Sequence, residues 1–144
     1  MAVPDTTRLR PVVAAAIVDS LQTPTKLLAT ARAYPPELAG MFELPGGKVE
    51  PKESLVTALE REIREELNAE IVLGAELSSP DSNGWPLPEG RRMYVWIAET
   101  QASVQVGASH LSHVWCDQET IFDLNWLPAD KEVIEALAMA LGWS

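Results

Sequence analysis

The clearest periodic pattern of apolar residues lies between residues 52 and 67, where leucine, isoleucine and valine recur three or four positions apart. This spacing matches one side of an α-helix, which turns once in about 3.6 residues. The pattern predicts a helix over residues 52–67 whose apolar stripe packs on the core. The stripe consists of Leu55, Val56, Leu59, Ile63 and Leu67, and the solvated side of Thr57, Glu60 and Arg64.

Short apolar runs and alternating segments predict strands elsewhere. We expect strands at residues 11–19, 26–32, 41–44, 70–77, 91–100 and 112–117, with a weak extension at 101–106. The first two are expected to form an antiparallel pair. Residues 91–100 carry Met93, Val95 and Ile97 on one face, and Tyr94 and Trp96 on the other. One face is expected to build the core, whereas the other either packs or presents an aromatic ring to a ligand.

Proline, glycine and serine mark the connections between these elements. Residues 33–40 and 78–90 are expected to be loops. A short helix is expected at residues 118–124, and a final helix begins at Pro128. Its apolar stripe consists of Val133, Ile134, Leu137, Ala138 and Leu141. Strands on either side of two helices indicate an α/β sandwich around a mixed sheet.

Length and charge narrow the possible functions. The chain has 144 residues, enough for one domain with its own core, and we expect a single domain over residues 1–144 with a polar arm at 1–10. Its formal net charge of −10 disfavours binding to a nucleic-acid polymer, which requires a basic face. The charge does not exclude a nucleoside triphosphate, because metal ions can bridge acidic side chains to phosphates.

The single cysteine, Cys116, excludes an internal disulfide and fits a reducing cytoplasm. The longest run of small apolar residues, 12–18, is far too short to span a membrane, and the features of a signal peptide are missing. We therefore expect a cytoplasmic protein without membrane attachment. The sequence leaves open whether the protein is a monomer or a homodimer.

Three glutamates, Glu62, Glu65 and Glu66, gather near the end of the predicted helix and flank its apolar stripe. Like charges at this spacing repel by about 0.2–0.5 kcal/mol per pair on an exposed helix. Either they form a solvated acidic face, or they share a hard divalent cation. Carboxylate oxygens are the ligands that Mg²⁺ and Mn²⁺ prefer, and Mg²⁺ commonly bridges to substrate phosphates.

The segment before the helix carries two further signals. Gly46 and Gly47 form either a plain turn or a place where the backbone approaches a ligand closely. Arg61 is suited to a bidentate pair with Glu53, which would hold the loop against the helix. The alternative for Arg61 is an exposed pair within the helix.

A spaced motif unites these residues: Gly47, five residues, Glu53, seven residues, Arg61-Glu62, Ile63, one residue, and Glu65-Glu66. It resembles the Nudix box, in which Gly, five residues, Glu, seven residues, Arg-Glu, an aliphatic residue, any residue and Glu-Glu are followed by any residue, Gly and an aliphatic residue. Asn68 and Ala69 depart from the last two positions. Asn is the best substitute for Gly at a left-handed C-cap, so the turn is expected to persist.

The box in its strand–loop–helix setting resembles a Nudix hydrolase. Residues 35–50 (PPELAGMFELPGGKVE) and 127–130 (LPAD) look like the MutT-like branch, nearest to the CTP/dCTP pyrophosphohydrolases. The resemblance implies a Nudix-type α/β/α sandwich and a role in cleaning nucleotide pools. It also implies cleavage of a nucleoside triphosphate to the monophosphate and pyrophosphate, by water attack on the β-phosphorus.

Site residues follow from the same resemblance, position by position. The implied ligands of Mg²⁺ (or Mn²⁺) are the Gly46 carbonyl, Glu62, Glu65 and Glu66. The implied catalytic residues are Glu62, Glu65, Glu53 and Arg61, of which either Glu62 or Glu65 takes the proton of the water. The implied phosphate-binding residues are Arg32 and Lys48. One departure concerns Ser109, which stands where relatives often have an acidic metal ligand or base, with His110 as a candidate helper and His113 as a surface residue.

The base-reading position of the family matches Asp130. A carboxylate there can accept the exocyclic amine of cytosine, or the N1–H and amine of guanine, so 8-oxo-dGTP is an alternative substrate. Asp130 could equally be an acid that stabilises the first turn of a helix. The expected walls of the base pocket are Leu44, Tyr94 and Trp126.

Two other classes of function compete with this interpretation. A non-catalytic Nudix-fold nucleotide-binding module is suggested by Ser109, and a hydrolase of other diphosphate compounds shares the box. The chain keeps every glutamate of the box and shows no additional element outside it. The pyrophosphohydrolase is therefore the preferred interpretation.

Overall fold

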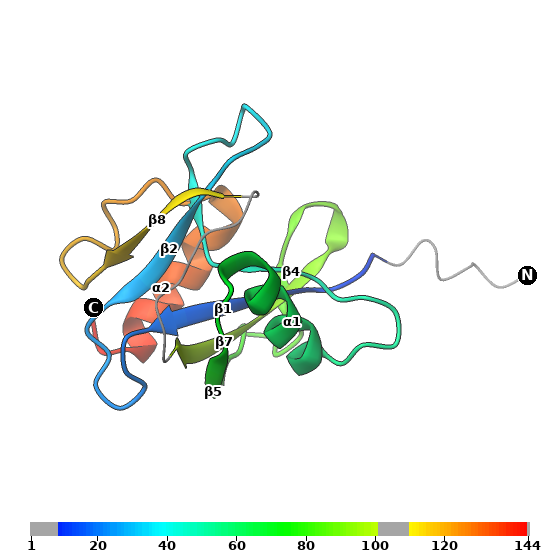
Figure 1. Cartoon of the computed structure of the whole chain (residues 1–144), viewed down its shortest axis with the longest axis horizontal. Helices are drawn as coiled ribbons and strands as arrows, with labels where there is room; N and C mark the ends of the chain where they lie inside the picture. The colour runs from blue at the N-terminus through cyan, green and yellow to red at the C-terminus, as the bar shows by residue number, and fades with distance from the viewer. Residues whose placement is uncertain (1–8, 101–109, 144) are drawn as a thin grey trace, which may run out of the picture.

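The computed structural model describes residues 9–100 and 110–143, which form one sheet with a helix on each face (Figure 1). The strands are β1 (Val12–Val18), β2 (Leu27–Arg32), β3 (Phe42–Glu43), β4 (Gly46–Lys48), β5 (Ile71–Leu77), β6 (Trp85–Pro86), β7 (Arg92–Thr100) and β8 (His110–Cys116). The α-helices are α1 (Leu55–Leu67) and α2 (Lys131–Ala140), and short 3₁₀ helices occur at η2 (Pro88–Gly90) and η3 (Pro128–Asp130).

β1 is the central strand of the sheet, whose order is β3-β2-β1-β7-β5. β4 pairs with β1, β6 with β7, and β8 with β2. β1 runs parallel to β7 and antiparallel to β2 and β4, so the sheet is mixed. The predicted antiparallel pairing of the first two strands is confirmed. The sequence of β1, VVAAAIV, is apolar throughout, as is typical of a strand that is buried on both faces.

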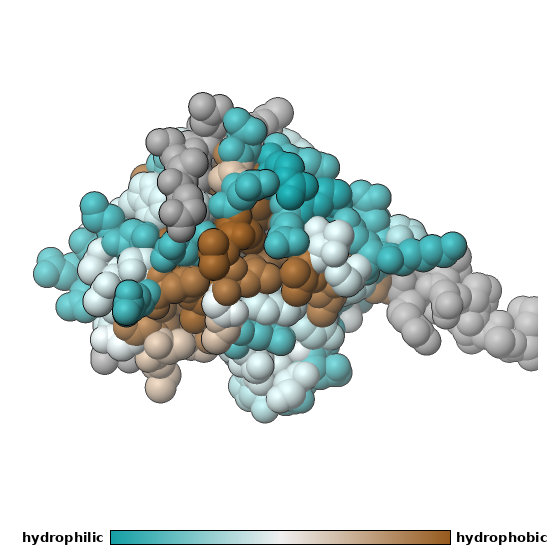
Figure 2. Space-filling view, turned by 60° about the horizontal axis from the view of Figure 1, so that its bottom comes forward, coloured by the Kyte–Doolittle hydropathy of each residue, from teal (hydrophilic) through white to brown (hydrophobic). Residues whose placement is uncertain are grey.

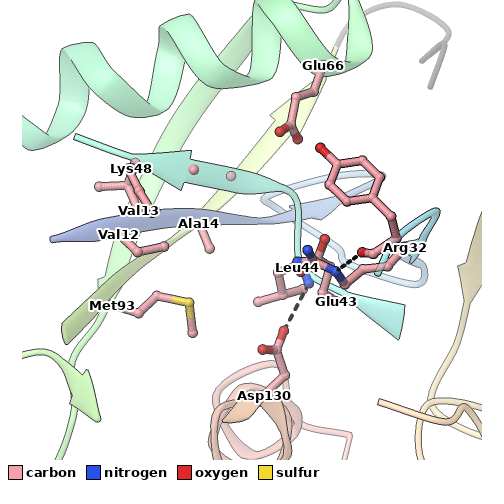
Figure 3. A pocket seen from close by; sticks show the side chains of 13 residues that line it. Val12, Val13, Ala14, Arg32, Glu43, Leu44, Lys48, Glu66, Met93 and Asp130 are labelled. Atoms are coloured by element: carbon pink, nitrogen blue, oxygen red, sulfur yellow. Dashed lines mark hydrogen bonds and ion pairs between the residues drawn. The ribbon is translucent and has the colours of Figure 1, made fainter. Parts of the chain in front are cut away.

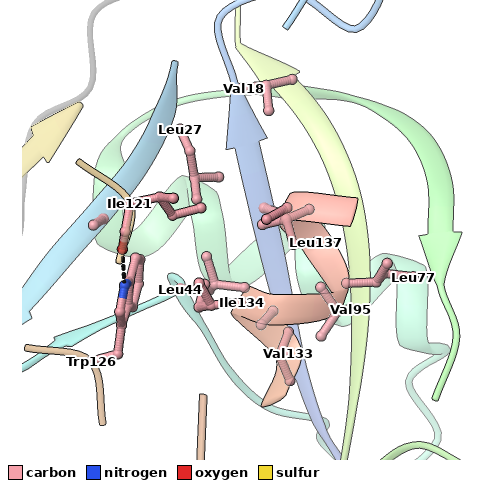
Figure 4. Close-up of a cluster of buried hydrophobic side chains, with 14 of the residues drawn as sticks. Val18, Leu27, Leu44, Leu77, Val95, Ile121, Trp126, Val133, Ile134 and Leu137 are labelled. Carbon is pink, nitrogen blue, oxygen red and sulfur yellow. Dashed lines mark hydrogen bonds between the residues drawn. The ribbon is translucent and has the colours of Figure 1, made fainter. Parts of the chain in front are cut away.

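Alternate residues of β1 enter two cores, one on each face of the sheet. Val18 packs in one core with Ile134 and Leu137 of α2 (Figure 4). Val13 and Ile17 pack in the other core with the apolar stripe of α1. Because successive side chains of a strand point to opposite faces, α1 and α2 cover opposite faces. The predicted sandwich is confirmed.

β7 alternates in the same way, and both of its faces are packed. Met93 and Val95 belong to the core on the α2 side, and Tyr94 and Trp96 pack against the core on the α1 side. Of the two readings offered by the sequence, packing describes Trp96, and Tyr94 contributes to the same face.

α1 begins at Leu55 rather than at residue 52. Lys52 has a left-handed φ of 67°, and the Ser54 side chain accepts a hydrogen bond from the Thr57 amide as the N-cap. At the other end Asn68 has a φ of 51° and its amide binds the Arg64 carbonyl, which confirms the left-handed C-cap predicted for it. Of the predicted stripe, Leu59, Ile63 and Leu67 are buried, whereas Leu55 is half-buried and Val56 is 36% exposed.

Other boundaries differ from the sequence prediction. The residues expected as a glycine turn form β4, and residues 78–90 contain β6 and η2. The short helix predicted at residues 118–124 is wrong. Turns occur there instead, and the Asp117 carboxylate accepts hydrogen bonds from the amides of Glu119 and Thr120. The last helix begins as η3 at Pro128 and continues as α2, with Leu141 at its C-cap. The weak extension at residues 101–106 lies outside the described residues.

Apolar side chains also reach the surface. Figure 2 shows one face of the molecule, on which apolar residues gather in the middle and polar residues surround them. Within residues 9–100 and 110–143, no helix has the length and apolarity needed to cross a membrane. The buried thiol of Cys116 donates to the Leu27 carbonyl at 3.4 Å, and burial raises the pKa of this thiol to about 11.

The pairing of β4 with β1 gives a test of the fold. A Cβ atom on Gly46 would lie 1.9 Å from the Val13 carbonyl oxygen, so Gly46→Ala should lower the free energy of unfolding by about 3 kcal/mol, at the upper end of overpacking costs. Gly90→Ala is the control, because a Cβ there meets open space and only the left-handed φ of 82° is strained. Urea unfolding measures both. A loss in Gly46→Ala no larger than that in Gly90→Ala would contradict this packing.

Candidate active site

A pocket of about 360 Å³ lies where β1, β4 and η3 meet (Figure 3). Six residues with an expected site role line it: Arg32, Leu44, Gly46, Lys48, Glu66 and Asp130. Groups expected to meet phosphates and a group expected to meet the base therefore face one cavity.

The three glutamates of α1 extend from the side of the helix that faces β4. The Nη1 atom of Arg61 donates both to Oε1 of Glu62 at 3.2 Å and to Oε1 of Glu65 at 3.1 Å. Glu66 points into the pocket (Figure 3), and its Oε2 atom is buried. Of the two helix carboxylates that Arg61 binds, Glu65 is the more exposed, with 57% of its side-chain surface accessible against 14% for Glu62.

Arg61 also forms the clamp that the sequence predicted. Its Nε and Nη2 atoms donate to the two carboxylate oxygens of Glu53 at 2.7 and 3.0 Å, and Nη2 donates to the Lys48 carbonyl at 3.2 Å. The guanidinium beside it lowers the pKa of Glu53 to about 2. The prediction of a bidentate pair that joins the loop to the helix is confirmed.

Gly47 has a steric role toward Glu62. A Cβ atom at position 47 would lie 1.6 Å from Glu62 Oε2, so only glycine leaves room for this carboxylate against the backbone of β4. Burial raises the pKa of Glu62, and the positive charge of Arg61 opposes that rise. Glu62 is thus in direct contact with the glycine segment.

The chemistry of this donor set fits a hard divalent cation, since carboxylate and carbonyl oxygens are the preferred ligands of Mg²⁺. In the part of the chain that the structure describes, no group of three acidic, histidine or cysteine side chains is arranged so that it could hold a metal ion. Arg61 Nη1 instead lies 3.2 Å from Oε1 of Glu62 and 3.1 Å from Oε1 of Glu65. Gly46 lies in β4, the strand that α1 contacts, and lines the same pocket as Glu66.

Arg32 and Lys48 both line the pocket but differ in their partners. Lys48 is exposed at the end of β4. Arg32 Nη1 pairs with Glu43 Oε1 at 3.2 Å, and its Nε donates to the Tyr34 carbonyl at 3.0 Å. Arg32 is therefore fixed in direction at the mouth of the pocket.

Asp130 is a buried carboxyl group at the closed end of the pocket. It is 5% exposed, and its Oδ2 accepts a hydrogen bond from the Leu44 amide at 3.0 Å (Figure 3). Burial raises the pKa of Asp130 to about 7, with the nearby charge of Glu43 adding to the rise, while the Leu44 amide and Arg32 oppose it. The structure thus brings Asp130 and Leu44 together.

The other expected walls of the base pocket lie elsewhere. Tyr94 packs on the α1 side of the sheet and lines a different hollow with Asn83 and Arg92. Trp126 is buried in the α2-side core, where its Nε1 donates to the Ile121 carbonyl at 2.7 Å (Figure 4). Neither lines the pocket of Asp130.

The histidine region is described only in part. Ser109 lies outside the described residues, and so does the side chain of His110. His113 lies in β8 opposite Thr30 and is half-buried rather than fully on the surface.

Besides Gly47 and residues 12–14 of β1, the pocket is lined by three side chains that had no expected role: Tyr34, Glu43 and Met93. The alternation of β7 predicts the face on which Met93 lies, but it does not show that this face meets the pocket. Glu43 directly precedes Leu44 in the expected strand. Tyr34 precedes two prolines in a loop and carries no local signal for a site.

Comparison with known proteins adds to this geometry. The chain is 36% identical over 125 residues to the Mycobacterium tuberculosis protein named "Putative 8-oxo-dGTP diphosphatase 2", covering 82% of this chain and 83% of the relative. It is 35% identical over 118 residues to the CTP pyrophosphohydrolase of Escherichia coli, covering 81% of this chain and 84% of the relative.

Solved structures share the fold. The Escherichia coli ORF135 protein has a TM-score of 0.74 at 32% identity, covering 98% of this chain and 96% of that chain. The MutT protein from Methanosarcina mazei Go1, at 22% identity, has a TM-score of 0.70 and covers 91% and 94%. The family model described as NUDIX domain matches residues 9–137, and with relatives above 30% identity over most of both chains, the chain belongs to the Nudix hydrolases.

Proposed function

We propose that this Nudix hydrolase cleaves a nucleoside triphosphate to the monophosphate and pyrophosphate, and that CTP, dCTP or a modified pyrimidine nucleotide is its substrate. One observation carries the proposal: the buried carboxyl group of Asp130 lines the same cavity as Lys48 and Glu66. A group suited to a base edge and groups suited to phosphates are thus within one cavity. The Escherichia coli relative named CTP pyrophosphohydrolase supports this substrate.

In this proposal the chain's own residues move one proton and hold the phosphates. Glu62 or Glu65 accepts a proton from the attacking water while the oxygen of that water bonds to the β-phosphorus. The bond from that phosphorus to the bridging oxygen of the α-phosphate breaks, so the pyrophosphate carries the new oxygen. Lys48 and Arg32 bind phosphate oxygens and keep the β-phosphorus in line with the water.

Nudix hydrolases generally use a divalent cation. The Gly46 carbonyl, Glu62, Glu65 and Glu66 would hold Mg²⁺ or Mn²⁺, which when bound neutralises phosphate charge and makes water more acidic. Through their bidentate pair, Glu53 and Arg61 hold the loop that follows β4 against α1, and Arg61 also binds the Lys48 carbonyl of β4. Their role in the proposal is therefore to keep the glycine segment and the glutamates at a constant separation.

Asp130 matches cytosine best in its neutral form. A neutral carboxyl group offers one donor and one acceptor, which complement the N3 acceptor and N4 amine of cytosine. The ionised form offers acceptors only, which complement the adjacent N1–H and N2 amine of guanine. With a pKa of about 7, Asp130 takes the neutral form below neutral pH and the ionised form above it.

The second candidate is a MutT-type hydrolase of 8-oxo-dGTP. The ionised form of Asp130 favours it, and so does the name of the mycobacterial relative. A non-catalytic module is less consistent with the site, because Glu53, Glu62, Glu65 and Glu66 of the box are all present.

Glu62→Gln should lower turnover by about 10²–10⁴-fold, the range attributed to a general base, while the fold persists because the amide has nearly the same shape. Glu60→Gln on the exposed side of α1 is the matched control and should behave as wild type. Pyrophosphate release gives the rates, and circular dichroism follows thermal unfolding. Near-wild-type turnover by Glu62→Gln would remove Glu62 from the site.

A substrate panel tests the proposed function directly. CTP, dCTP, 5-methyl-dCTP, dGTP, 8-oxo-dGTP, ADP-ribose and a dinucleoside tetraphosphate are incubated with the protein, with and without Mg²⁺, and the products are separated by chromatography. We expect Mg²⁺-dependent release of pyrophosphate, fastest from a cytidine nucleotide. Faster cleavage of 8-oxo-dGTP would select the second candidate, and no turnover of any compound would favour the non-catalytic module.

The base preference should depend on pH. Because the pKa of Asp130 is raised to about 7, the kcat/KM ratio of CTP to 8-oxo-dGTP should fall about tenfold as the pH rises from 6 to 8, in keeping with about 1–3 kcal/mol per bidentate base contact. Asp130→Asn keeps one donor and one acceptor and cannot titrate, so its ratio should stay constant and favour CTP. The same pH trend in Asp130→Asn would assign the effect to other groups.

A further inference from the structure

Tyr34 is an exposed aromatic residue at the open side of the pocket. Its surface is 57% accessible, yet it lines the same cavity as Leu44 and the buried Asp130. An aromatic ring loses a large favourable free energy of burial when it stays in water. Since neither of the two cores includes Tyr34, packing does not account for its position.

The guanidinium group of Arg32 lies over one face of the Tyr34 ring. The guanidinium carbon of Arg32 lies 6.0 Å from the centroid of the Tyr34 ring, and its Nε donates to the Tyr34 carbonyl at 3.0 Å. Its Nη1 is in turn bound to Glu43 Oε1 at 3.2 Å. These contacts hold the Arg32 guanidinium against one face of the ring in a weak cation–π arrangement.

The loop that carries Tyr34 is closed by its own main chain. The Arg32 amide binds the Met41 carbonyl and the Gly40 amide binds the Arg32 carbonyl, both at 2.9 Å. The Leu38 amide binds the Pro35 carbonyl at 2.9 Å. None of these hydrogen bonds uses the Tyr34 side chain, so the loop is ordered independently of the ring.

We propose that the Tyr34 ring forms the outer wall of the base subsite and stacks on the face of the nucleobase. This inference rests on the proposed function and extends it to a substrate-binding residue. Asp130 lies at the closed end of the cavity, where it meets the edge of the base, and Tyr34 lies at the open end, where it meets the face. The ligand class is a purine or pyrimidine nucleoside triphosphate, because every base has a π-face.

The separate roles of Asp130 at the base edge and Tyr34 at the base face have a measurable consequence. Stacking is tolerant of base identity, so Tyr34 adds affinity for CTP and 8-oxo-dGTP alike. Edge contacts at Asp130 distinguish between bases. Loss of the Tyr34 ring should therefore weaken both nucleotides by the same factor and leave their ratio unchanged.

The experiment compares wild type with Tyr34→Phe, Tyr34→Leu and Tyr34→Ala. Steady-state kinetics are measured with CTP and 8-oxo-dGTP, and calorimetry measures binding of α,β-methylene-CTP without turnover. We expect Tyr34→Phe to stay within twofold of wild type. Tyr34→Leu and Tyr34→Ala should raise KM and the dissociation constant about tenfold for each nucleotide, with kcat nearly unchanged and unfolding temperature unchanged.

The outcomes separate this inference from the function on which it rests. If the wild type binds or cleaves nucleotides and Tyr34→Ala does so equally well, the stacking role is wrong while the proposed function stands. A loss in Tyr34→Phe as large as in Tyr34→Ala would assign the effect to the hydroxyl group and overturn stacking. A wild type that binds the analogue but cleaves neither CTP nor 8-oxo-dGTP would overturn the proposed function, and tenfold weaker binding of the analogue by Tyr34→Ala would still support stacking. A wild type that neither binds nor cleaves would overturn both.

Discussion

The burial of β1 on both faces is the constraint on which the rest of the molecule depends. A strand that is apolar along its whole length must be covered on each side, and α1 and α2 provide the two covers. β4 pairs with the same strand, which places Gly46 against the Val13 carbonyl and Gly47 against the Glu62 carboxylate. The candidate catalytic glutamates are therefore positioned by the contact that closes one of the two cores.

The sequence predicted the parts of the site that local rules determine. Glu53 and Arg61 lie on one short loop and the helix that follows it, so their pairing needs no knowledge of the rest of the fold. Asn68 ends α1 because its short side chain tolerates the left-handed conformation. The start of α1 was harder to predict from the sequence, since the chain has a left-handed conformation at Lys52 just before the cap at Ser54.

The remaining pocket depends on contacts between distant segments. Asp130 and Leu44 are 86 positions apart, and only the resemblance to a known family suggested a role for Asp130. Alternation along β7 separated Met93 from Tyr94 but could not show which face meets the pocket, and the structure has Met93 there. The wrong helix at residues 118–124 is a local difference instead: the Asp117 carboxylate accepts from the amides of Glu119 and Thr120 as a helix N-cap does, yet the residues that follow form turns.

The hydrogen bond between Asp130 and the Leu44 amide has a consequence for the length of the substrate. Only Pro45 separates Leu44 from Gly46. Proline has a restricted φ, and the Pro45 carbonyl is bound by the Ala15 amide at 2.9 Å. In the proposed binding mode, a short, stiff piece of backbone therefore joins the residues that meet the base to those that meet the phosphates, and it sets the distance between them. Under that proposal a larger base would not be accommodated by stretching this piece, so its sugar and phosphates would shift instead. Selection among nucleotides would then depend on the distance from base to β-phosphorus as well as on the hydrogen bonds at the base edge.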